Sequence, residues 1–300
     1  MPSRILISEF MDTPAVEGLR ARFDVDYRPK LVDDAAALQA GLAGAHAWIV
    51  RNRTQVRGAA LAAAKDLRVV GRLGVGLDNI DVAACEARRI AVIPATGANA
   101  ESVAEYVVTT ALVLLRGAYG STKAVEAGTW PRQMLSQGRE ASGKVLGIVG
   151  YGSIGRLTAV KATALGMRVV SHDPAVASPG ARDLDSLLAE CDVVSLHVPL
   201  TEATRGLLDA RRLALMKPDA IVINTARGGI VDEAALAARL RAGKLGGAAL
   251  DVFDDEPLKA GSVLAGAPRL LLTPHIAGVT VESNERVSAL IAERVAAALG

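Results

Sequence analysis

The sequence has few cysteines and no apolar run long enough to cross a membrane. Cys85 and Cys191 are the only cysteines, and neither has a second Cys or His at metal-ligand spacing, so we expect neither a disulfide framework nor a metal site. The best apolar run, residues 106–115, carries two threonines and falls short of the roughly 18 residues of a membrane span. The first ten residues lack the zones of a signal peptide. We therefore expect a cytoplasmic protein with no membrane partner.

An excess of charge of one sign is also lacking. Lys and Arg total 34 against 32 for Asp and Glu, and aromatic residues make up 3% of the chain. Nucleic-acid binding needs a basic surface, and single strands also need aromatic platforms for the bases. The composition therefore predicts that the chain has no nucleic-acid partner.

The pattern that is present is a repeated alternation of short aliphatic strands with Ala- and Leu-rich helical stretches. At 300 residues, the chain is long enough for two domains. The alternation is typical of parallel βαβ units, and it occurs twice. The first set contains strand candidates at residues 5–8, 25–28, 47–51, 67–73 and 91–94, and the second at 144–150, 167–173, 192–198, 220–226, 246–252 and 269–274. The predicted fold class is α/β, with two doubly wound parallel-sheet lobes.

A glycine-rich loop opens the second set, in KVLGIVGYGSIG. Gly150, Gly152 and Gly155 have the spacing G-x-G-x-x-G between a strand and a helix. The first permits a tight turn, the second lets a pyrophosphate approach the backbone, and the third allows the helix to pack closely on the strand. The amides of Ser153 and Ile154 then face the anion at the helix N-terminus. Glycines in such a turn can also serve the backbone alone.

An acidic residue after the next strand strengthens the prediction of a dinucleotide site. Asp173 lies 18 positions beyond Gly155 and has no Arg immediately beside it. A carboxylate there accepts hydrogen bonds from the ribose hydroxyls and repels a 2′-phosphate. The sequence therefore favours NAD over NADP.

Three polar side chains follow later strands of the second set. Arg227 follows the strand AIVINTA, Glu256 follows GAALDV, and His275 follows the last strand, within LLLTPHIAG at residues 270–278. Open α/β sheets bind ligands at the carboxyl ends of their strands. Alone, the arginine is as typical of a surface position as of a site, the glutamate is more typical of a solvated acidic loop, and the histidine is more typical of a structural role. Similarly, the amides in the turn GRLGVGLDNID, residues 71–81, suit either a carboxylate ligand or a plain tight turn.

Two helical stretches indicate how the lobes are joined. Residues 98–128 read as one long helical stretch, uninterrupted by Pro or Gly from 98 to 116, and its apolar content predicts burial, with a second subunit as one candidate cover. Residues 279–299 form an amphipathic helix that we expect to return to the first lobe. These crossings predict hinges near residue 95 and at 275–279.

Seven motifs in order resemble the D-isomer-specific 2-hydroxyacid dehydrogenases. The resemblance implies two flavodoxin- or Rossmann-like lobes around a cleft, with a substrate domain of residues 1–96 plus 276–300 and an NAD-binding domain of residues 97–275. It also implies no C-terminal regulatory domain. The motifs are GRLGVGLDNID, NAESVAEYV, GREASGKVLGIVGYGSIG, HVPLTEATRGLL, KPDAIVINTARGGIVDEAAL, ALDVFDDEP and LLTPHIAG.

By this resemblance Arg227, Glu256 and His275 match the family's catalytic residues. NADH delivers hydride to C2 of a small 2-oxo acid, and the product is the D-2-hydroxy acid. Arg227 then orients the substrate carboxylate and polarises the carbonyl. His275 donates the proton to the oxygen, and Glu256 orients the imidazole and favours its charged form.

The resemblance carries over further positions and partners. It implies a homodimer through the NAD-binding domain, with residues 129–140 as a variable segment near the pocket, and the tail after His275 suggests substrates with an added polar or anionic group, such as glycerate, phosphoglycerate or sulfolactate. The alternative is an NAD-sensing binding protein like the co-repressors of this fold. The implied cofactor-binding residues beyond the glycine loop and Asp173 are Pro199, Thr204, Thr225, Ala226, Asp251 and Gly278, and the implied substrate-binding residues are Arg51, Val75, Gly76 and Arg227.

Overall fold

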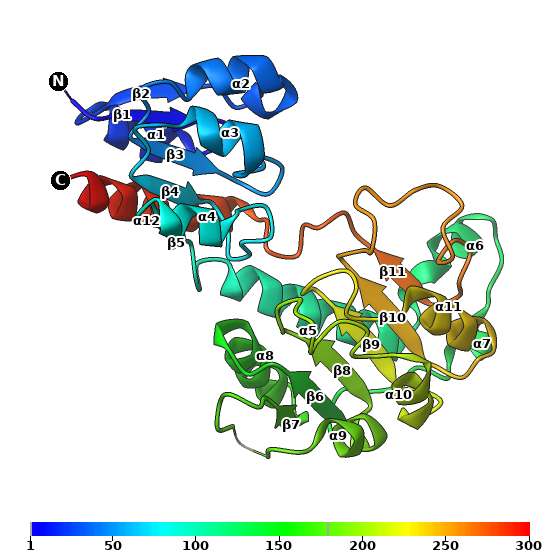
Figure 1. Ribbon diagram of the computed structural model, residues 1–300. Helices are drawn as coiled ribbons and strands as arrows, with labels where there is room; N and C mark the ends of the chain where they lie inside the picture. The colour runs from blue at the N-terminus through cyan, green and yellow to red at the C-terminus, as the bar shows by residue number, and fades with distance from the viewer. Residues whose placement is uncertain (1, 179) are drawn as a thin grey trace. The chain divides into compact units, whose positions relative to one another are not determined.

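Two α/β units divide the chain (Figure 1). The structure is a computed structural model that describes residues 2–178 and 180–300. Unit 1 comprises the chain up to Asn99 together with Val279–Gly300, and unit 2 comprises Ala100–Gly278. The chain therefore passes between the units three residues after each boundary that we expected from the sequence.

Unit 1 contains a five-stranded sheet in which every pair of neighbours is parallel, in the order β2-β1-β3-β4-β5. This order places a topological switch point between β1 and β3, which is where open α/β sheets accept ligands. The strands are β1 (Arg4–Ile7), β2 (Asp24–Tyr27), β3 (Ala47–Val50), β4 (Val69–Arg72) and β5 (Ala91–Pro94). The helices are α1 (Thr13–Arg20), η1 (Leu31–Asp33), α2 (Ala35–Gly41), α3 (Gly58–Ala63), α4 (Val82–Ala87) and α12 (Val281–Leu299).

Helix α12 completes the core of unit 1. Val287, Ile291 and Val295 are buried in one hydrophobic cluster with Ile5 and Ile49 of the central strands. Their spacing of four residues aligns them on one side of the helix, so this side packs on the sheet. The amphipathic pattern after residue 279 thus finds its apolar partner in unit 1.

Unit 2 contains a six-stranded parallel sheet in the order β11-β10-β9-β8-β6-β7. A single bridge from Ser171 to Ala181 lies beyond β7, so the third strand of the usual Rossmann order is reduced to one paired residue. The strands are β6 (Val145–Val149), β7 (Arg168–His172), β8 (Val193–Leu196), β9 (Ile221–Asn224), β10 (Gly247–Leu250) and β11 (Leu270–Leu272). The helices are α5 (Ala100–Arg116), η2 (Tyr119–Ser121), α6 (Thr122–Glu126), α7 (Arg132–Leu135), α8 (Ser153–Ala164), α9 (Leu184–Glu190), α10 (Ala210–Leu215) and α11 (Glu233–Arg241).

Helix α5 is a core helix of unit 2 and is shorter than the helical stretch predicted up to residue 128. It packs against α8, and its Val107, Ala111 and Leu114 are buried in the cluster that also holds strands of the sheet. It ends at Arg116 because Gly117 adopts φ +67°, a left-handed conformation that stops the helix. The unit's own core therefore accounts for the apolar content of α5 without a second subunit.

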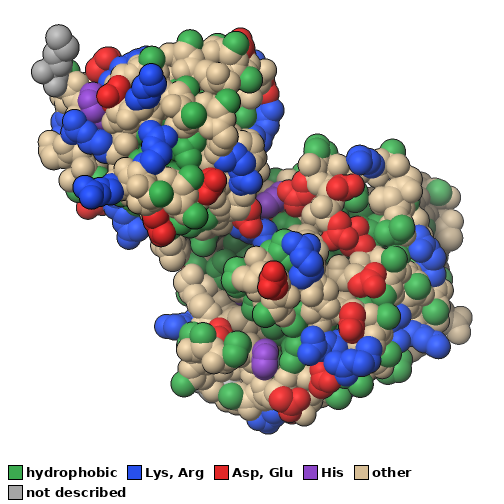
Figure 2. Space-filling view, in the orientation of Figure 1, with side chains coloured by type: hydrophobic (Ala, Val, Ile, Leu, Met, Phe, Trp, Pro, Cys, Tyr) green, Lys and Arg blue, Asp and Glu red, His purple; other side chains and the backbone are tan. Residues whose placement is uncertain are grey.

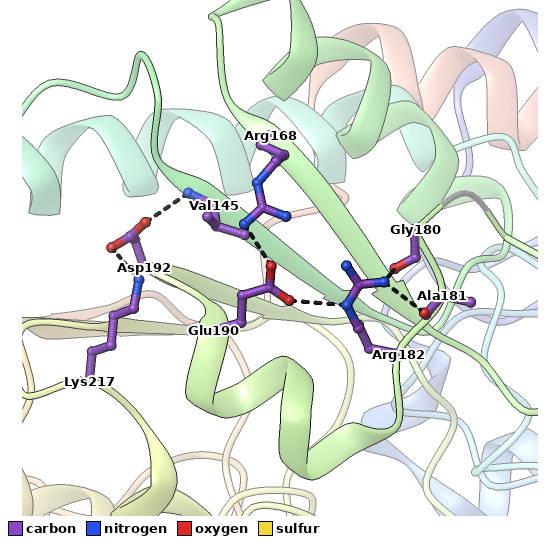
Figure 3. A network of polar contacts seen from close by, with 8 residues as sticks. All are labelled: Val145, Arg168, Gly180, Ala181, Arg182, Glu190, Asp192 and Lys217. Atoms are coloured by element: carbon purple, nitrogen blue, oxygen red, sulfur yellow. Dashed lines mark hydrogen bonds and ion pairs between the residues drawn. The ribbon is translucent and has the colours of Figure 1, made fainter.

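Ion pairs hold the amino edge of the unit 2 sheet (Figure 3). Glu190 binds Arg168 at 2.6 Å and Arg182 at 3.1 Å, and Asp192 binds Lys217 at 3.1 Å. Hydrogen bonds from Arg168 and Arg182 lower the pKa of the Glu190 carboxyl. Arg168 opens β7 and Asp192 immediately precedes β8, so these pairs lie at the strand ends opposite to the predicted site.

Charges of both signs are interspersed over the face drawn in Figure 2. No helix in the described part of the chain is long and apolar enough to cross a membrane. Among the described residues, no three His, Cys, Asp or Glu side chains are grouped to hold a metal ion.

Candidate functional site

The predicted residues of unit 2 all follow the carboxyl ends of its strands. Because every strand runs parallel to its neighbours, these ends lie along one edge of the sheet. In spatial order from β11 to β7, the edge carries His275, then Asp251 and Glu256, then Thr225, Ala226 and Arg227, then Pro199, then the glycine loop, then Asp173.

Two of the three glycines in the loop after β6 have no room for a side chain. Gly150 adopts φ +95°, and a Cβ there would lie 2.6 Å from the carbonyl oxygen of His197. A Cβ on Gly155 would lie 2.3 Å from the carbonyl oxygen of Gly150, whereas one on Gly152 would meet no atom within 4 Å. Open space therefore lies at Gly152, the N-cap of α8, which has no side-chain cap. This cradle fits a pyrophosphate on the amides of Ser153 and Ile154.

Asp173 ties the end of β7 to the glycine loop. Its Oδ2 accepts the amide of Tyr151 at 2.7 Å, and its Oδ1 accepts the amides of Ala175 and Val176 at 2.8 and 3.1 Å. Burial opposes ionisation, but these three amides lower the pKa of the Asp173 carboxyl. A carboxylate offers about four acceptor positions, so one is left for a ribose hydroxyl.

His197 lies beside the same loop and was not anticipated from the sequence. Its Nε2 lies 3.0 Å from Oγ of Ser195, and burial lowers its pKa to about 4. The ring is therefore neutral near neutral pH and adds no cation beside the phosphate cradle.

A buried asparagine shapes the turn that presents Arg227. Asn224, only 2% exposed at the end of β9, donates from Nδ2 to the carbonyl of Arg227 at 2.8 Å and accepts the amide of Ala226 at 3.0 Å. Nη1 of Arg227 donates to the carbonyl of Ala226 at 2.6 Å. The sequence signal for this supporting role was a polar residue inside the aliphatic run AIVINTA, because a buried side-chain amide needs hydrogen-bond partners.

The loop that carries Glu256 interlocks with the Arg227 turn. The amide of Gly229 donates to Asp254 at 2.6 Å. A Cβ on Gly228 would lie 1.8 Å from the carbonyl oxygen of Phe253, so the two backbones touch at this point. Oε1 of Glu256 accepts the amide of Phe253 at 3.1 Å, and Glu256 precedes a cis proline, Pro257. The two loops therefore hold each other in place.

A hydrogen bond joins His275 to Glu256. Nδ1 of His275 lies 2.7 Å from Oε2 of Glu256, and both side chains are about one third exposed, at 38% and 35%. Since a carboxylate only accepts, Nδ1 carries the proton, and Nε2 is the nitrogen directed away from Glu256. His275 adopts φ +55°, a left-handed conformation that costs a residue with a Cβ about 1 kcal/mol. Such strain at a polar residue is typical of functional sites.

The remaining predicted positions of unit 2 lie in the segments that follow β8, β9 and β11. The hydroxyl of Thr204 donates to the carbonyl of Pro199 at 2.6 Å and accepts the amide of Thr201 at 2.8 Å, so it shapes the loop after β8. Oγ1 of Thr225 is buried with no hydrogen-bond partner among the described residues. Gly278 is the last residue of unit 2.

Three of the four predicted substrate-binding residues, all except Arg227, lie in unit 1. The backbone amide of Arg51, just after β3, donates to Glu9 at 2.8 Å, and Nη2 of Arg51 donates to Asn284 at 2.9 Å. Val75 and Gly76 lie in the turn after β4, and within residues 2–178 and 180–300 their amides have no acceptor. These amides are therefore available to a ligand.

Comparison with known proteins decides the family. The NAD binding domain of the D-isomer specific 2-hydroxyacid dehydrogenases matches residues 108–277. The chain belongs to this family. It is 56% identical to an (S)-sulfolactate dehydrogenase of Chromohalobacter salexigens over 99% of both chains. It is 41% identical to a D-3-phosphoglycerate dehydrogenase of Mycobacterium leprae, over 89% of this chain and 51% of that one.

Solved structures share this fold over nearly the whole chain. A protein of Thermus thermophilus has a TM-score of 0.90 with 36% identity, over 99% of this chain and 96% of that one. A D-lactate dehydrogenase of Aquifex aeolicus, complexed with NAD and lactic acid, has a TM-score of 0.86 with 30% identity, over 98% of this chain and 95% of that one. As a D-2-hydroxyacid dehydrogenase, the chain binds NAD and interconverts a 2-oxo acid and its 2-hydroxy acid, as the motifs predicted.

Proposed function

We propose that the substrate pair is 3-sulfopyruvate and (S)-3-sulfolactate. The observation that carries this proposal is the 56% identity to an (S)-sulfolactate dehydrogenase over nearly the whole of both chains. The stereochemistry agrees with the predicted D product. Sulfur outranks oxygen in the naming rules, so (S)-sulfolactate has the same arrangement around C2 as D-lactate.

The surroundings of Arg51 support a doubly anionic substrate. The nearby carboxylate of Glu9 already accepts three backbone amides, those of Arg51, Arg53 and Thr54. Burial lowers the pKa of the Arg51 guanidinium although Glu9 opposes the shift, as expected for a cation that is partly desolvated. We assign Arg51 to the anionic groups of the substrate, together with the amides of Val75 and Gly76.

Three residues of unit 2 carry the chemistry in this proposal. NADH, when bound, supplies the hydride to C2 of the 2-oxo acid. Arg227 binds the substrate carboxylate and stabilises the negative charge that develops on the carbonyl oxygen. His275 donates a proton from Nε2 to that oxygen and removes it in the reverse direction. Glu256 holds the ring by the 2.7 Å bond at Nδ1 and stabilises the imidazolium.

The same edge of unit 2 holds the dinucleotide in this proposal. Ser153 and Ile154 bind the pyrophosphate, and Asp173 binds the ribose hydroxyls and disfavours NADPH. The nicotinamide half is flanked by the residues nearer the catalytic three, which are Thr225, Ala226, Asp251 and Gly278. The adenosine is flanked by two residues after β8, Pro199 and Thr204.

Kinetics across a panel of 2-oxo acids tests the substrate. We expect kcat/KM with NADH to be highest for 3-sulfopyruvate, against 3-phosphohydroxypyruvate, hydroxypyruvate, pyruvate and glyoxylate. The identity of 41% to a phosphoglycerate dehydrogenase makes 3-phosphohydroxypyruvate the second candidate. R51M should reduce kcat/KM for 3-sulfopyruvate more than for glyoxylate, which has only two carbons and therefore no second anionic group. R20M, which removes an exposed arginine whose sole ion-pair partner among the described residues is Glu17, is the matched control. Equal effects of R51M on both substrates would contradict the assignment.

The proton-donor role has its own test. H275A should lower kcat by about 10²- to 10⁴-fold, the usual worth of general acid catalysis, while NADH still binds. Fluorescence titration with NADH measures the binding. A variant with near-normal kcat would exclude the role.

We further propose a homodimer through the NAD-binding unit and a cytoplasmic location. The segment after α5 exposes four large apolar side chains, Tyr119, Val125, Trp130 and Met134, at 46–76% of their area. Exposed apolar residues gathered on one segment are typical of a protein–protein interface. W130E/M134E should therefore yield monomers in light scattering, whereas V160E, at an exposed valine of α8, should not.

The proposed cytoplasmic location rests on the two cysteines, whose thiols are free and buried, as is typical of a reducing compartment. Cell fractionation tests this location.

A further inference from the structure

A chain of three polar side chains lies behind the loop that presents His275. The hydroxyl of Tyr106, on α5, lies 2.6 Å from Oγ1 of Thr273. Oγ1 of Thr273 lies 2.6 Å from Oδ1 of Asp251, which is only 1% exposed. Tyr106 and Thr273 are both partly buried. The three groups come from α5, from the residue after β11 and from the residue after β10.

The direction of the hydrogen bonds in this chain is fixed. The Asp251 carboxylate only accepts, so the single hydroxyl proton of Thr273 is donated to Oδ1. Oγ1 of Thr273 therefore accepts the hydrogen bond that the Tyr106 hydroxyl donates. Burial raises the pKa of the Tyr106 phenol, which keeps that proton in place. The chain therefore runs from Tyr106 through Thr273 to Asp251.

The Asp251 carboxylate in turn fixes the backbone on both sides of His275. Oδ1 accepts the amide of Ile276 and Oδ2 that of Ala277, each at 2.8 Å. The backbone carbonyl of Asp251 accepts the amide of His275, also at 2.8 Å. The left-handed φ of +55° at His275 directs the ring toward Glu256, and these bonds offset the strain of that conformation.

We propose that Tyr106 and Thr273 are positioning residues for His275, acting through Asp251. Their hydroxyls bond to each other and to Asp251, whereas the His275 ring bonds to Glu256. Thr273 orients the Asp251 carboxylate so that its two oxygens meet two successive amides, and Tyr106 orients Thr273. The inference rests on the proposed proton donation by His275 for its kinetic consequence, but not for its structural one.

Variants that remove single hydroxyl groups test the kinetic consequence. T273V removes the hydroxyl at nearly constant volume and should slow single-turnover oxidation of NADH by 3-sulfopyruvate about tenfold, the worth of one hydrogen bond to a charged group. Y106F, which removes a bond to a neutral group, should slow it about threefold. T273S keeps the hydroxyl and should stay within about twofold of the wild type. The NADH dissociation constant should change less than the single-turnover rate, because the glycine loop after β6 and Asp173 are untouched. T110V is the matched control, because within the described part of the chain the Thr110 hydroxyl bonds only to carbonyls of its own helix.

Histidine NMR gives a readout that needs neither substrate nor cofactor. The protein has only four histidines, His46, His172, His197 and His275, so ¹⁵N-histidine labelling yields a simple side-chain spectrum, and H275Q assigns one of them. T273V should shift or broaden the ring signals of His275 and leave those of His46, in unit 1, unchanged. T273S should restore the wild-type spectrum.

A double variant tests whether Tyr106 acts through Thr273. In the T273V background, Y106F should have no further effect on the single-turnover rate. Additive effects would overturn the proposed order of the chain. A T273V protein with lowered Tm but unchanged rate and unchanged His275 signals would overturn the positioning role. If instead H275A is active while T273V still moves the His275 signals, the proposed proton donor fails and the positioning survives.

Discussion

Replacing Gly228 by alanine perturbs two proposed catalytic residues at once. The added Cβ would lie 1.8 Å from the carbonyl oxygen of Phe253 and 2.7 Å from the amide nitrogen of Asp254. Because such contacts need about 3 Å, either the Arg227 turn or the loop of Glu256 must move by more than 1 Å. A displacement of about 1 Å in a catalytic group costs about 10²-fold in rate. Overpacking of this kind also costs about 1–3 kcal/mol of stability.

We expect G228A to lose about 10²-fold in kcat/KM for the preferred 2-oxo acid. Its NADH dissociation constant should stay near that of the wild type, because the glycine loop after β6 is untouched. G18A is the matched control, since Gly18 lies inside α1 of unit 1 with no atom within 4 Å of the added Cβ. The control should gain about 1 kcal/mol from helix propensity. Full activity in folded G228A would refute the claim that the two loops are rigidly interlocked.

Three further outcomes follow from ionisable groups. In the unfolded chain His197 binds a proton below about pH 6.5, whereas burial lowers the pKa of the folded ring to about 4. As the pH falls from about 6.5 to about 4, the wild type should therefore lose up to about 3 kcal/mol of stability. H197Q should lose correspondingly less, as measured by urea titrations at about pH 4.5 and about pH 7.5. D173A should weaken NADH binding about tenfold and reduce discrimination against NADPH, measured by isothermal titration, and an unchanged coenzyme preference would exclude the ribose contact. Burial raises the pKa of Cys191 to about 12 and also raises that of Cys85, so neither thiol should react with a disulfide reagent at pH 8 until denaturant is added, and rapid labelling of the native protein would contradict this.

Much of the fold was predictable because strand periodicity and glycine spacing are local properties. Each of the eleven strand candidates corresponds to a strand of the structure, from β1 to β11. The end of α5 at Gly117 was missed, since nothing in the surrounding sequence shows that this glycine takes a left-handed conformation. The sequence also could not show that the apolar side of α5 is covered within its own unit, because packing depends on residues distant along the chain.

The candidate site divides in the same way. Arg227, Glu256 and His275 were predictable as a group because parallel strands bring their carboxyl ends to one edge. The supporting bonds were not, since they join residues far apart in sequence. Tyr106 and Thr273 are 167 positions apart, and Asn224 supports the Arg227 turn from inside a strand. The roles of the three residues at that edge stay predictions until the variants are measured.

The return of α12 to unit 1 has a consequence for folding during synthesis. The residues of unit 2 form one continuous stretch, whereas the core of unit 1 needs both Ile5, near the start of the chain, and Val295, near its end. During translation, unit 2 therefore completes its sheet while β1 and β3 still lack the helix that covers them. For that interval the apolar side of the unit 1 sheet is exposed to solvent. This is therefore the surface through which the nascent chain would aggregate or bind a chaperone.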